Sequence, residues 1–296
     1  MKPTGIPHQL DNLFALLYGA PKSGKTTFAL QPCDSNYAIT VLDLENNLYP
    51  ASKWKNCDNI NVINLKWEGE ANQSPAIAFL LALRSGRRRP FVWDCTDKKL
   101  AAATFDPSHV YCRVDVNKAR PDDILVMDSW SMLSQQITAA KFEGAYSMNA
   151  QTAEITQPMW GNMVRDAEGA VVTLNSLPVM SKIVLAHEYM ETGLTTPMSV
   201  TRAHGQSLSK SFTVVARFVN GNIEIIAGAG KAQREKKSLD KYTFSMLLSE
   251  LGRKPPAVFT PSEAFVFEMG DEMAKLTAQA NKLAVNTTNV NVNIRK

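Results

Sequence analysis

Short apolar runs that stop at glycine or at acidic residues recur along the chain. The first of them, Leu13–Tyr18, ends at Gly19 and has the length and composition of a buried strand. Similar runs predict further strands over most of the chain. They span Tyr37–Leu44, Ile60–Leu65, Phe91–Asp94, Ile124–Met127, Lys182–Ala186, Phe212–Phe218, Ile223–Ile226 and Ala227–Gly230.

Segments with a helical pattern of apolar residues lie between these runs. Pro32 should end the first helix early, and Ser262 is placed to cap the last one. Strands that alternate with helices favour an α/β fold with a largely parallel sheet and right-handed connections. The predicted helices are Thr26–Leu30, Pro75–Leu83, Ser131–Phe142, Asp240–Leu251 and Ser262–Leu283.

Four segments lack a clear period. We expect Cys95–Ala119 to be an insertion or a hairpin, and Ala145–Asn162, which contains Pro158, to be a mobile loop followed by a helix. Glu188–Ala203 is rich in Thr, Met, Gly and Pro, which predicts a loop. The Asn-rich segment Val285–Lys296 is either a flexible tail or an added edge strand.

Composition narrows the class of protein. The 296 residues are 45% hydrophobic, enough for one large core with a small appendage. The formal net charge of +4 permits a polyanionic partner without requiring one. We expect no transmembrane helix and no secretory signal, because no long apolar stretch is present. The four cysteines lack metal-ligand spacing, so we expect reduced thiols in a cytoplasmic protein.

The stretch Gly19–Thr26 matches the phosphate-loop pattern G-x-x-x-x-G-K-[ST] in full. Glycines let successive backbone N–H groups point at phosphate oxygens, and the next helix adds the positive end of its dipole. Lys25 can reach the β and γ phosphates, and Thr26 can place its hydroxyl on Mg²⁺. The predicted nucleotide-binding residues are Gly19, Ala20, Pro21, Lys22, Ser23, Gly24, Lys25, Thr26 and Thr27, with Asp128 beside them.

Polar residues follow the other predicted strands at their carboxyl ends. Asp128 can hold Mg²⁺ opposite Thr26, or it can cap the helix that follows. Glu45 can act as a general base that activates water, or it can be a solvated strand end. His187 can contact the γ-phosphate of ATP, or it can be an ordinary core or turn histidine.

The order of these elements, from Leu13 to Ile226, resembles the RecA-like ATPase core. VLDLENNL resembles its strand ending in Asp-x-Glu, ILVMDSWSML its Walker B strand, and IVLAHEY its sensor strand. The resemblance implies a RecA-like P-loop NTPase core with a largely parallel sheet flanked by helices, and catalytic roles for Glu45, Lys25 and His187. GQSLSKSFTVVARF (Gly205–Phe218) resembles the segment that closes the family's second DNA-binding loop.

Within this superfamily the chain resembles short phage-encoded RecA-like nucleotide-binding proteins associated with single-strand annealing and recombination. That resemblance implies a Mg²⁺-dependent ATPase stimulated by single-stranded DNA. It also implies a homo-oligomer, as a ring or filament, and phage replication or recombination proteins as partners in the host cytoplasm. No N-terminal oligomerisation domain is recognisable, Trp67–Ala119 is enlarged, and the Gly-Gly pair before the second loop is missing. Strand exchange is therefore not implied.

Two basic regions are candidates for contacts with DNA or with a neighbouring subunit. The resemblance implies that Tyr189 stacks on a base and that Arg202, His204 and Lys210 lie near nucleic acid; the alternative is an ordinary solvated loop. The basic cluster at 231–237 can reach the γ-phosphate bound by a neighbouring subunit, as an arginine finger does. It can instead contact the phosphates of a nucleic-acid backbone, or form a solvated face. Its finger candidates are Lys231, Arg234 and Lys236.

We therefore expect a RecA-like core over residues 1–230, with an insertion at about 67–119. A basic C-terminal helical extension over 231–284 and a tail over 285–296 should follow. The alternative function is an ATP-controlled oligomeric interaction module, such as a loader or packaging accessory, whose main partner is protein. A small-molecule kinase is disfavoured, because no Arg-rich lid segment is recognisable.

Overall fold

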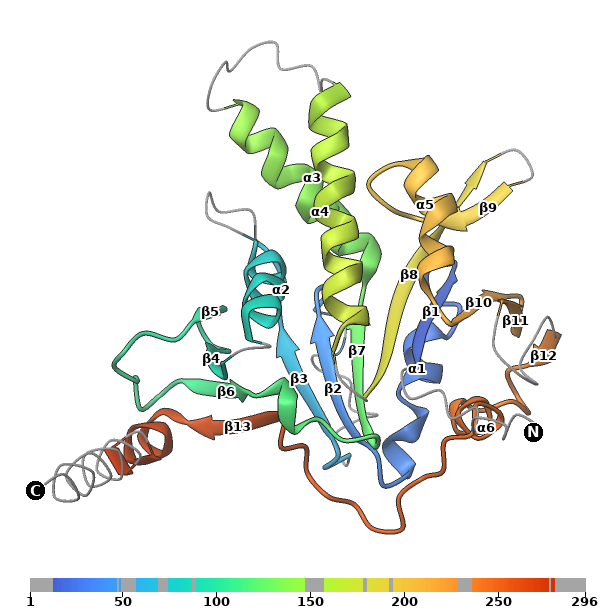
Figure 1. The fold of residues 1–296 in the computed structure, drawn as a ribbon. Helices are drawn as coiled ribbons and strands as arrows, with labels where there is room; N and C mark the ends of the chain where they lie inside the picture. The colour runs from blue at the N-terminus through green and yellow to red at the C-terminus, as the bar shows by residue number, and fades with distance from the viewer. Residues whose placement is uncertain are drawn as a thin grey trace, which may run out of the picture.

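A large, mostly parallel sheet forms the centre of the computed structural model (Figure 1). The structure describes residues 13–46, 48, 57–68, 74–86, 89–146, 157–177, 180–191, 194–227, 236–276 and 278–279. The strands follow the order β12-β11-β10-β1-β8-β7-β2-β3, and β9 pairs with β8 off this path. They are β1 (Phe14–Gly19), β2 (Ala38–Asp43), β3 (Ile60–Asn64), β7 (Asp123–Asp128), β8 (Ser181–Glu191), β9 (Leu194–Pro197), β10 (Val214–Val219), β11 (Asn222–Ala227) and β12 (Lys236–Ser238).

Strands β10, β1, β8, β7, β2 and β3 pair in parallel, whereas β11 and β12 add antiparallel pairs at one edge. The phosphate-loop strand β1 lies between β10 and β8, and β8 separates β1 from β7, which ends at Asp128. The predicted α/β fold with a largely parallel sheet is confirmed.

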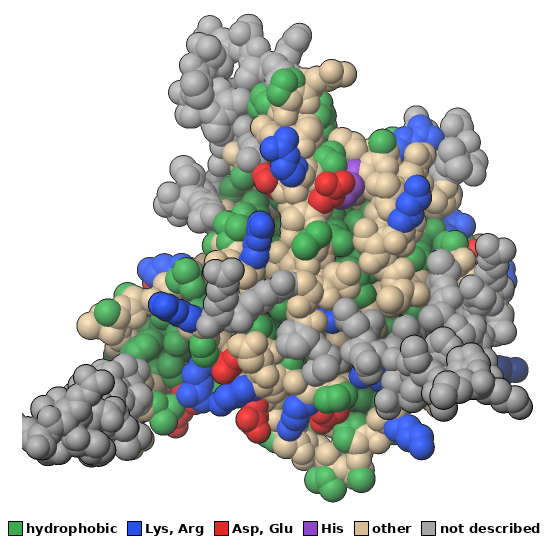
Figure 2. Space-filling view, in the orientation of Figure 1, with side chains coloured by type: hydrophobic (Ala, Val, Ile, Leu, Met, Phe, Trp, Pro, Cys, Tyr) green, Lys and Arg blue, Asp and Glu red, His purple; other side chains and the backbone are tan. Residues whose placement is uncertain are grey.

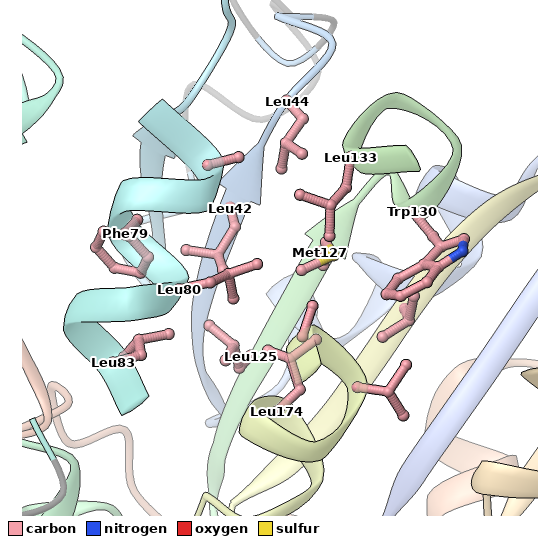
Figure 3. Close-up of a cluster of buried hydrophobic side chains, with 14 of the residues drawn as sticks. Leu42, Leu44, Phe79, Leu80, Leu83, Leu125, Met127, Trp130, Leu133 and Leu174 are labelled. Carbon is pink, nitrogen blue, oxygen red and sulfur yellow. The ribbon is translucent and has the colours of Figure 1, made fainter. Parts of the chain in front are cut away.

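Helices bury both faces of this sheet. In β1, Phe14 and Leu16 face a core shared with α2, α3 and α4, while Ala15 and Leu17 face a second core shared with α1 and α6. Figure 3 shows part of the first core, where Leu80 of α2 lies on the side of the helix that faces Leu42 of β2. The helices are α1 (Lys25–Ala29), α2 (Pro75–Gly86), α3 (Trp130–Tyr146), α4 (Gln157–Asn175), α5 (Arg202–Leu208) and α6 (Phe244–Glu250), with 3₁₀ turns at Gln31–Asp34, Val116–Lys118 and Ser209–Ser211.

A second, antiparallel sheet lies beside the first, in the order β13-β6-β4-β5. Trp93, Cys112 and Phe265 from three of its strands are buried in the core that faces α2. The segment from Trp67 to Ala119 thus contributes α2 and most of this sheet. Its strands are β4 (Phe91–Asp94), β5 (Lys99–Leu100), β6 (Val110–Val114) and β13 (Phe265–Met269).

The predicted helix Ser262–Leu283 is wrong over its first part, because Phe265–Met269 is strand β13. Phe265, Phe267 and Met269 alternate with other residues at a period of two, and the strand pairs with Val110–Val114. The helix begins only at Gly270. The partner strand lies about 150 residues earlier, so local composition did not reveal the pairing.

The predicted loop Glu188–Ala203 is also wrong. Strand β8 continues to Glu191 and forms an antiparallel pair with β9, after which α5 starts at Arg202. Pro158 lies in the first turn of α4, where a missing backbone N–H is tolerated. The predictions for Val285–Lys296 and for 228–230 fall outside the described residues.

Across the described residues, no helix is both long enough and apolar enough to cross a lipid bilayer.

Candidate functional site

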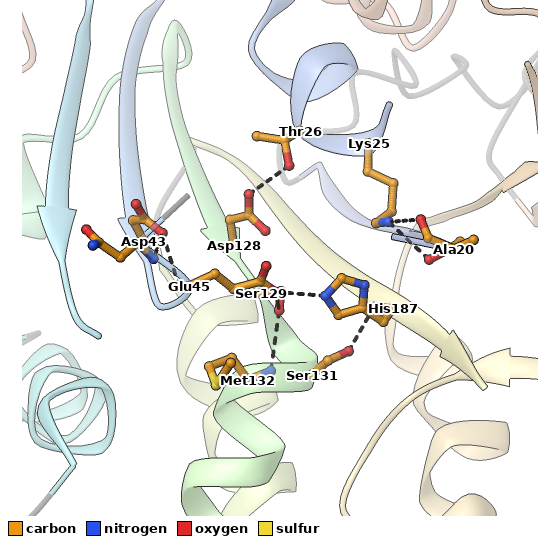
Figure 4. Close-up of polar contacts among 12 residues, drawn as sticks. Ala20, Lys25, Thr26, Asp43, Glu45, Asp128, Ser129, Ser131, Met132 and His187 are labelled. Carbon is orange, nitrogen blue, oxygen red and sulfur yellow. Dashed lines mark hydrogen bonds and ion pairs between the residues drawn. The ribbon is translucent and has the colours of Figure 1, made fainter. Parts of the chain in front are cut away.

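The carboxyl ends of four parallel strands bring the predicted site residues together (Figure 4). The phosphate loop follows β1, Glu45 follows β2, Asp128 ends β7, and His187 lies on β8 in register with Gly19. Open parallel sheets bind ligands at this edge, in the crevice beyond the ends of the strands.

The phosphate loop takes a tight path. Gly24 has φ 95° and Lys22 has φ 61°, both in the left-handed region. Gly19 leaves no room for a side chain, because a Cβ there would collide with the backbone oxygen of Phe218. Pro21, Lys22 and Thr27 are exposed.

Lys25 is buried over the loop that precedes it. Its Nζ atom donates to the carbonyl oxygens of Gly19 at 3.0 Å and Ala20 at 2.7 Å, and to Oγ of Ser23 at 3.3 Å. Burial lowers the pKa of the Lys25 ammonium, whereas the carboxylate of Asp128 acts to raise it. An ammonium held here by neutral acceptors is well placed to exchange them for phosphate oxygens, which are stronger acceptors.

Thr26 and Asp128 meet directly. The hydroxyl of Thr26 donates to Oδ2 of Asp128 at 2.8 Å. Burial raises the pKa of the Asp128 carboxyl to about 6, and the nearby acids Glu45 and Asp43 act in the same direction. A hydroxyl and a carboxylate are hard oxygen ligands, and crowded acidic groups favour a divalent cation. The donor set therefore fits Mg²⁺.

Asp43 fixes the turn that carries Glu45. Its Oδ1 atom accepts the backbone N–H groups of Glu45 at 3.1 Å and Asn46 at 2.8 Å, and its Oδ2 atom accepts that of Leu48 at 3.2 Å. Asn64, at the end of β3, donates to the side chain of Asn46 at 2.9 Å. Asp43 is 1% exposed, so it acts on the backbone of the turn and not on solvent.

The Glu45 carboxylate accepts hydrogen bonds from Ser129 Oγ and from His187 Nε2, the latter at 2.9 Å. Burial acts to raise the pKa of Glu45, but the hydrogen bonds from His187 and Ser129 lower it, and the net pKa lies below its ordinary value. Glu45 is therefore ionised at neutral pH, as a general base must be.

His187 links this carboxylate to the β8–β9 hairpin. Its backbone N–H donates to Ser131 Oγ at 2.8 Å, and its backbone oxygen accepts the N–H of Met198 at 2.8 Å. The next residue, Ser199, accepts from Trp130 Nε1 at 3.0 Å and contacts His204 Nδ1 at 2.8 Å. A continuous set of contacts thus joins the acidic end of β2 to α5.

The predicted DNA-facing residues separate into two groups. Tyr189 is 44% exposed on β8, and Arg202 and Lys210 are exposed on α5 and the turn after it. His204 is only 5% exposed, and burial lowers its pKa, so it offers no cationic surface. In Figure 2, Lys and Arg side chains lie over the α4 and α5 regions, with acidic and His side chains between them.

The finger candidates are only partly described. Lys236 is 61% exposed on β12 and pairs with Glu224 at 3.4 Å. Lys231 and Arg234 lie outside the described residues.

Sequence reasoning missed several polar partners of the site. Ser129 and Ser131 bond Glu45 and the His187 backbone, and both follow Asp128 in the segment DSWS, which was the available signal. Arg217 was also missed. Its Nε atom donates to the carboxylate of Glu188 at 3.1 Å, and Glu188 directly follows His187. A single arginine within a predicted strand does not indicate such a partner from the sequence.

No family model and no curated protein sequence matches this chain. Among solved structures, it is similar to an ATPase from the type III secretion system of pathogenic bacteria, with 13% identity and a TM-score of 0.38. That match covers 72% of this chain but only 55% of the ATPase chain. It is also similar to the RadB recombinase, with 12% identity, a TM-score of 0.40, and coverage of 76% of this chain and 85% of that one.

Proposed function

We propose that this chain binds ATP with Mg²⁺ and hydrolyses it. The hydrogen bond between Thr26 and Asp128 carries this proposal, since it joins the phosphate loop to a buried carboxylate from a distant strand. Lys25 beside this pair would bind the β and γ phosphates, and Mg²⁺ held by Thr26 and Asp128 would neutralise charge on them.

Glu45 would accept a proton from the attacking water. Its low pKa keeps it ionised, and its turn is held by Asp43. Ser129 and His187 both bond the same oxygen of this carboxylate, Oε1, and together they fix its orientation at the end of the turn. His187 would then report the state of the γ-phosphate to the hairpin that follows.

We propose single-stranded DNA as the polymer on which this ATPase acts, in phage recombination, annealing or replication. Tyr189, Arg202 and Lys210 are exposed on the elements that directly follow His187. A protein of this kind would work in the host cytoplasm as a ring or filament, with phage replication or recombination proteins as partners. Lys236 is the described candidate for a contact in trans.

The test measures ATP turnover and oligonucleotide binding by the purified chain, by the Lys25→Ala variant and by a control, Lys118→Ala. The control removes an exposed cation from the turn that precedes β7, whereas Asp128 and the phosphate loop lie at the other end of that strand. Turnover that needs Mg²⁺, rises with single-stranded DNA and disappears only in Lys25→Ala is expected. A wild-type chain that binds no nucleotide would refute the ATPase. Turnover and ATP-dependent assembly without any DNA binding would favour the protein-partner module instead.

A further inference from the structure

A cavity of about 560 Å³ opens between the first turn of α4 and the connection from β9 to α5. Two aromatic side chains line it, Trp160 of α4 and Tyr189 of β8, together with Arg202 at the start of α5. The other lining residues are Thr196, Pro197, Met198, Ser199, Val200 and Thr201.

The lining is almost free of charge. Arg202 is the one charged residue among those that line the described cavity, and its side chain is exposed. A phosphate is therefore disfavoured inside the cavity and favoured beside Arg202, whereas a neutral planar group suits the aromatic and apolar lining.

Two of the hydroxyl groups around the cavity, those of Ser199 and Thr201, already serve the fold. Ser199 bonds Trp130 and His204, and Thr201 accepts the backbone N–H of His204 as the cap of α5. These bonds limit how far Ser199 and Thr201 can read the hydrogen-bonding edge of a base, so we expect binding here to depend mainly on stacking.

We propose that this cavity accepts one unstacked base of single-stranded nucleic acid, which stacks on Trp160 while Arg202 pairs with its phosphate. This inference rests on the proposed action on single-stranded DNA and adds Trp160 as the stacking platform. Because stacking tolerates any base, the site should show little sequence preference.

The experiment compares two fluorescently labelled oligonucleotides of equal length, one with normal bases and one abasic, by anisotropy with an ATP analogue and Mg²⁺. Wild type should bind the normal strand more tightly. Trp160→Ala should weaken that binding by about ten-fold and leave abasic binding unchanged, and Trp160→Phe should retain most of it. Arg202→Ala should weaken binding of both strands and reduce the salt dependence.

Thermal melting of each variant separates loss of folding from loss of a contact. Equal wild-type affinity for the two strands, or Trp160→Ala binding the normal strand as wild type does, would overturn the base pocket while leaving DNA binding intact. Equal weakening of both strands by Trp160→Ala would also overturn it. If neither strand binds wild type, the proposed action on DNA fails, and the base pocket fails with it.

Discussion

The imidazole Nε2 of His187 lies 2.9 Å from Oε1 of Glu45, although β7 separates their strands in the sheet. The contact spans the edge of the sheet and holds the carboxylate over the end of β7. It also lowers the pKa of Glu45 against the opposing effect of burial. The pKa of Glu45 therefore depends on the position in which β8 holds the His187 imidazole.

Replacing His187 with Ala should shift the acid limb of the ATPase pH profile upward. Without the imidazole donor, burial raises the pKa of Glu45, so a smaller fraction of the carboxylate is ionised in acid. The rate should therefore fall further below that of wild type near pH 6 than near pH 8. His187→Gln is the matched control, because its amide can still donate. An unshifted profile in His187→Ala would show that the contact does not tune Glu45.

Asp43→Ala should lower both the stability and the maximal ATPase rate. The change leaves three buried or half-buried backbone N–H groups of the Glu45 turn without their acceptor. We expect a cost of about 1–3 kcal/mol in urea unfolding. Asp43→Asn should be milder, since its carbonyl oxygen can still accept the N–H groups of Glu45 and Asn46. Wild-type rates in Asp43→Ala would contradict the assigned role.

Asp128→Asn should stabilise the nucleotide-free protein at neutral pH. The folded-state pKa of about 6 lies above the ordinary value of 3.8, so stability is lost as pH rises through that interval. Removing the ionisable group should recover up to about 3 kcal/mol at pH 7.5 and almost nothing near pH 4. Urea unfolding in EDTA at both pH values measures the difference. Mg²⁺ with an ATP analogue should then stabilise wild type more than the variant, and equal stabilisation would count against the metal site.

Arg217→Ala should destabilise the protein more than Lys236→Ala, although each removes one cation from an ion pair. Arg217 pairs with Glu188, whose side chain is 6% exposed, whereas the Lys236 side chain is 61% exposed. Leaving the buried carboxylate of Glu188 without its donor should cost about 1–3 kcal/mol. Loss of the Lys236 pair should cost less than about 0.5 kcal/mol. Chemical denaturation of both variants checks the order, and similar values would contradict it.

Gly205→Ala should destabilise the packing of α5 on β9. A Cβ at this position would collide with the backbone oxygen of Pro197, which cannot rotate away. Gly161→Ala in α4 is the control, because nothing lies within 4 Å of its Cβ position. That change should be neutral or stabilising by about 0.5–1 kcal/mol. A melting temperature unchanged by Gly205→Ala would mean that the two backbones are less closely packed than described.

The sheet and the phosphate loop were predictable because their signals are local. Each buried strand is a continuous apolar run, since both faces of a parallel sheet are covered by helices. Glycine positions and Lys25 form a contiguous motif, and Asp128 directly ends one of the runs. The sequence reasoning therefore located Lys25, Thr26 and Asp128 correctly relative to the strands.

What could not be predicted depends on residues far apart in the chain. Phe265–Met269 is a strand because it pairs with β6, which lies far earlier in the chain. Ser129 belongs to the site because its hydroxyl bonds the carboxylate of Glu45, which follows a different strand. The exposure of a side chain also depends on distant parts of the chain. His204 belongs to a polar segment, yet its side chain is buried and contacts Ser199. In α5, burial and not residue type decides which basic side chain reaches solvent: Arg202 does and His204 does not.

The pairing of β13 with β6 also sets an order of assembly. Strands β1 to β10 of the central sheet are complete once residue 219 has been synthesised, but the small sheet still lacks one edge. Until Phe265–Met269 emerges from the ribosome, β6 presents unpaired backbone groups and Cys112 and Val114 lack part of their cover. A chain that stops before this point would carry a complete parallel sheet but an uncovered strand edge at β6, and such edges favour association with other unfinished copies.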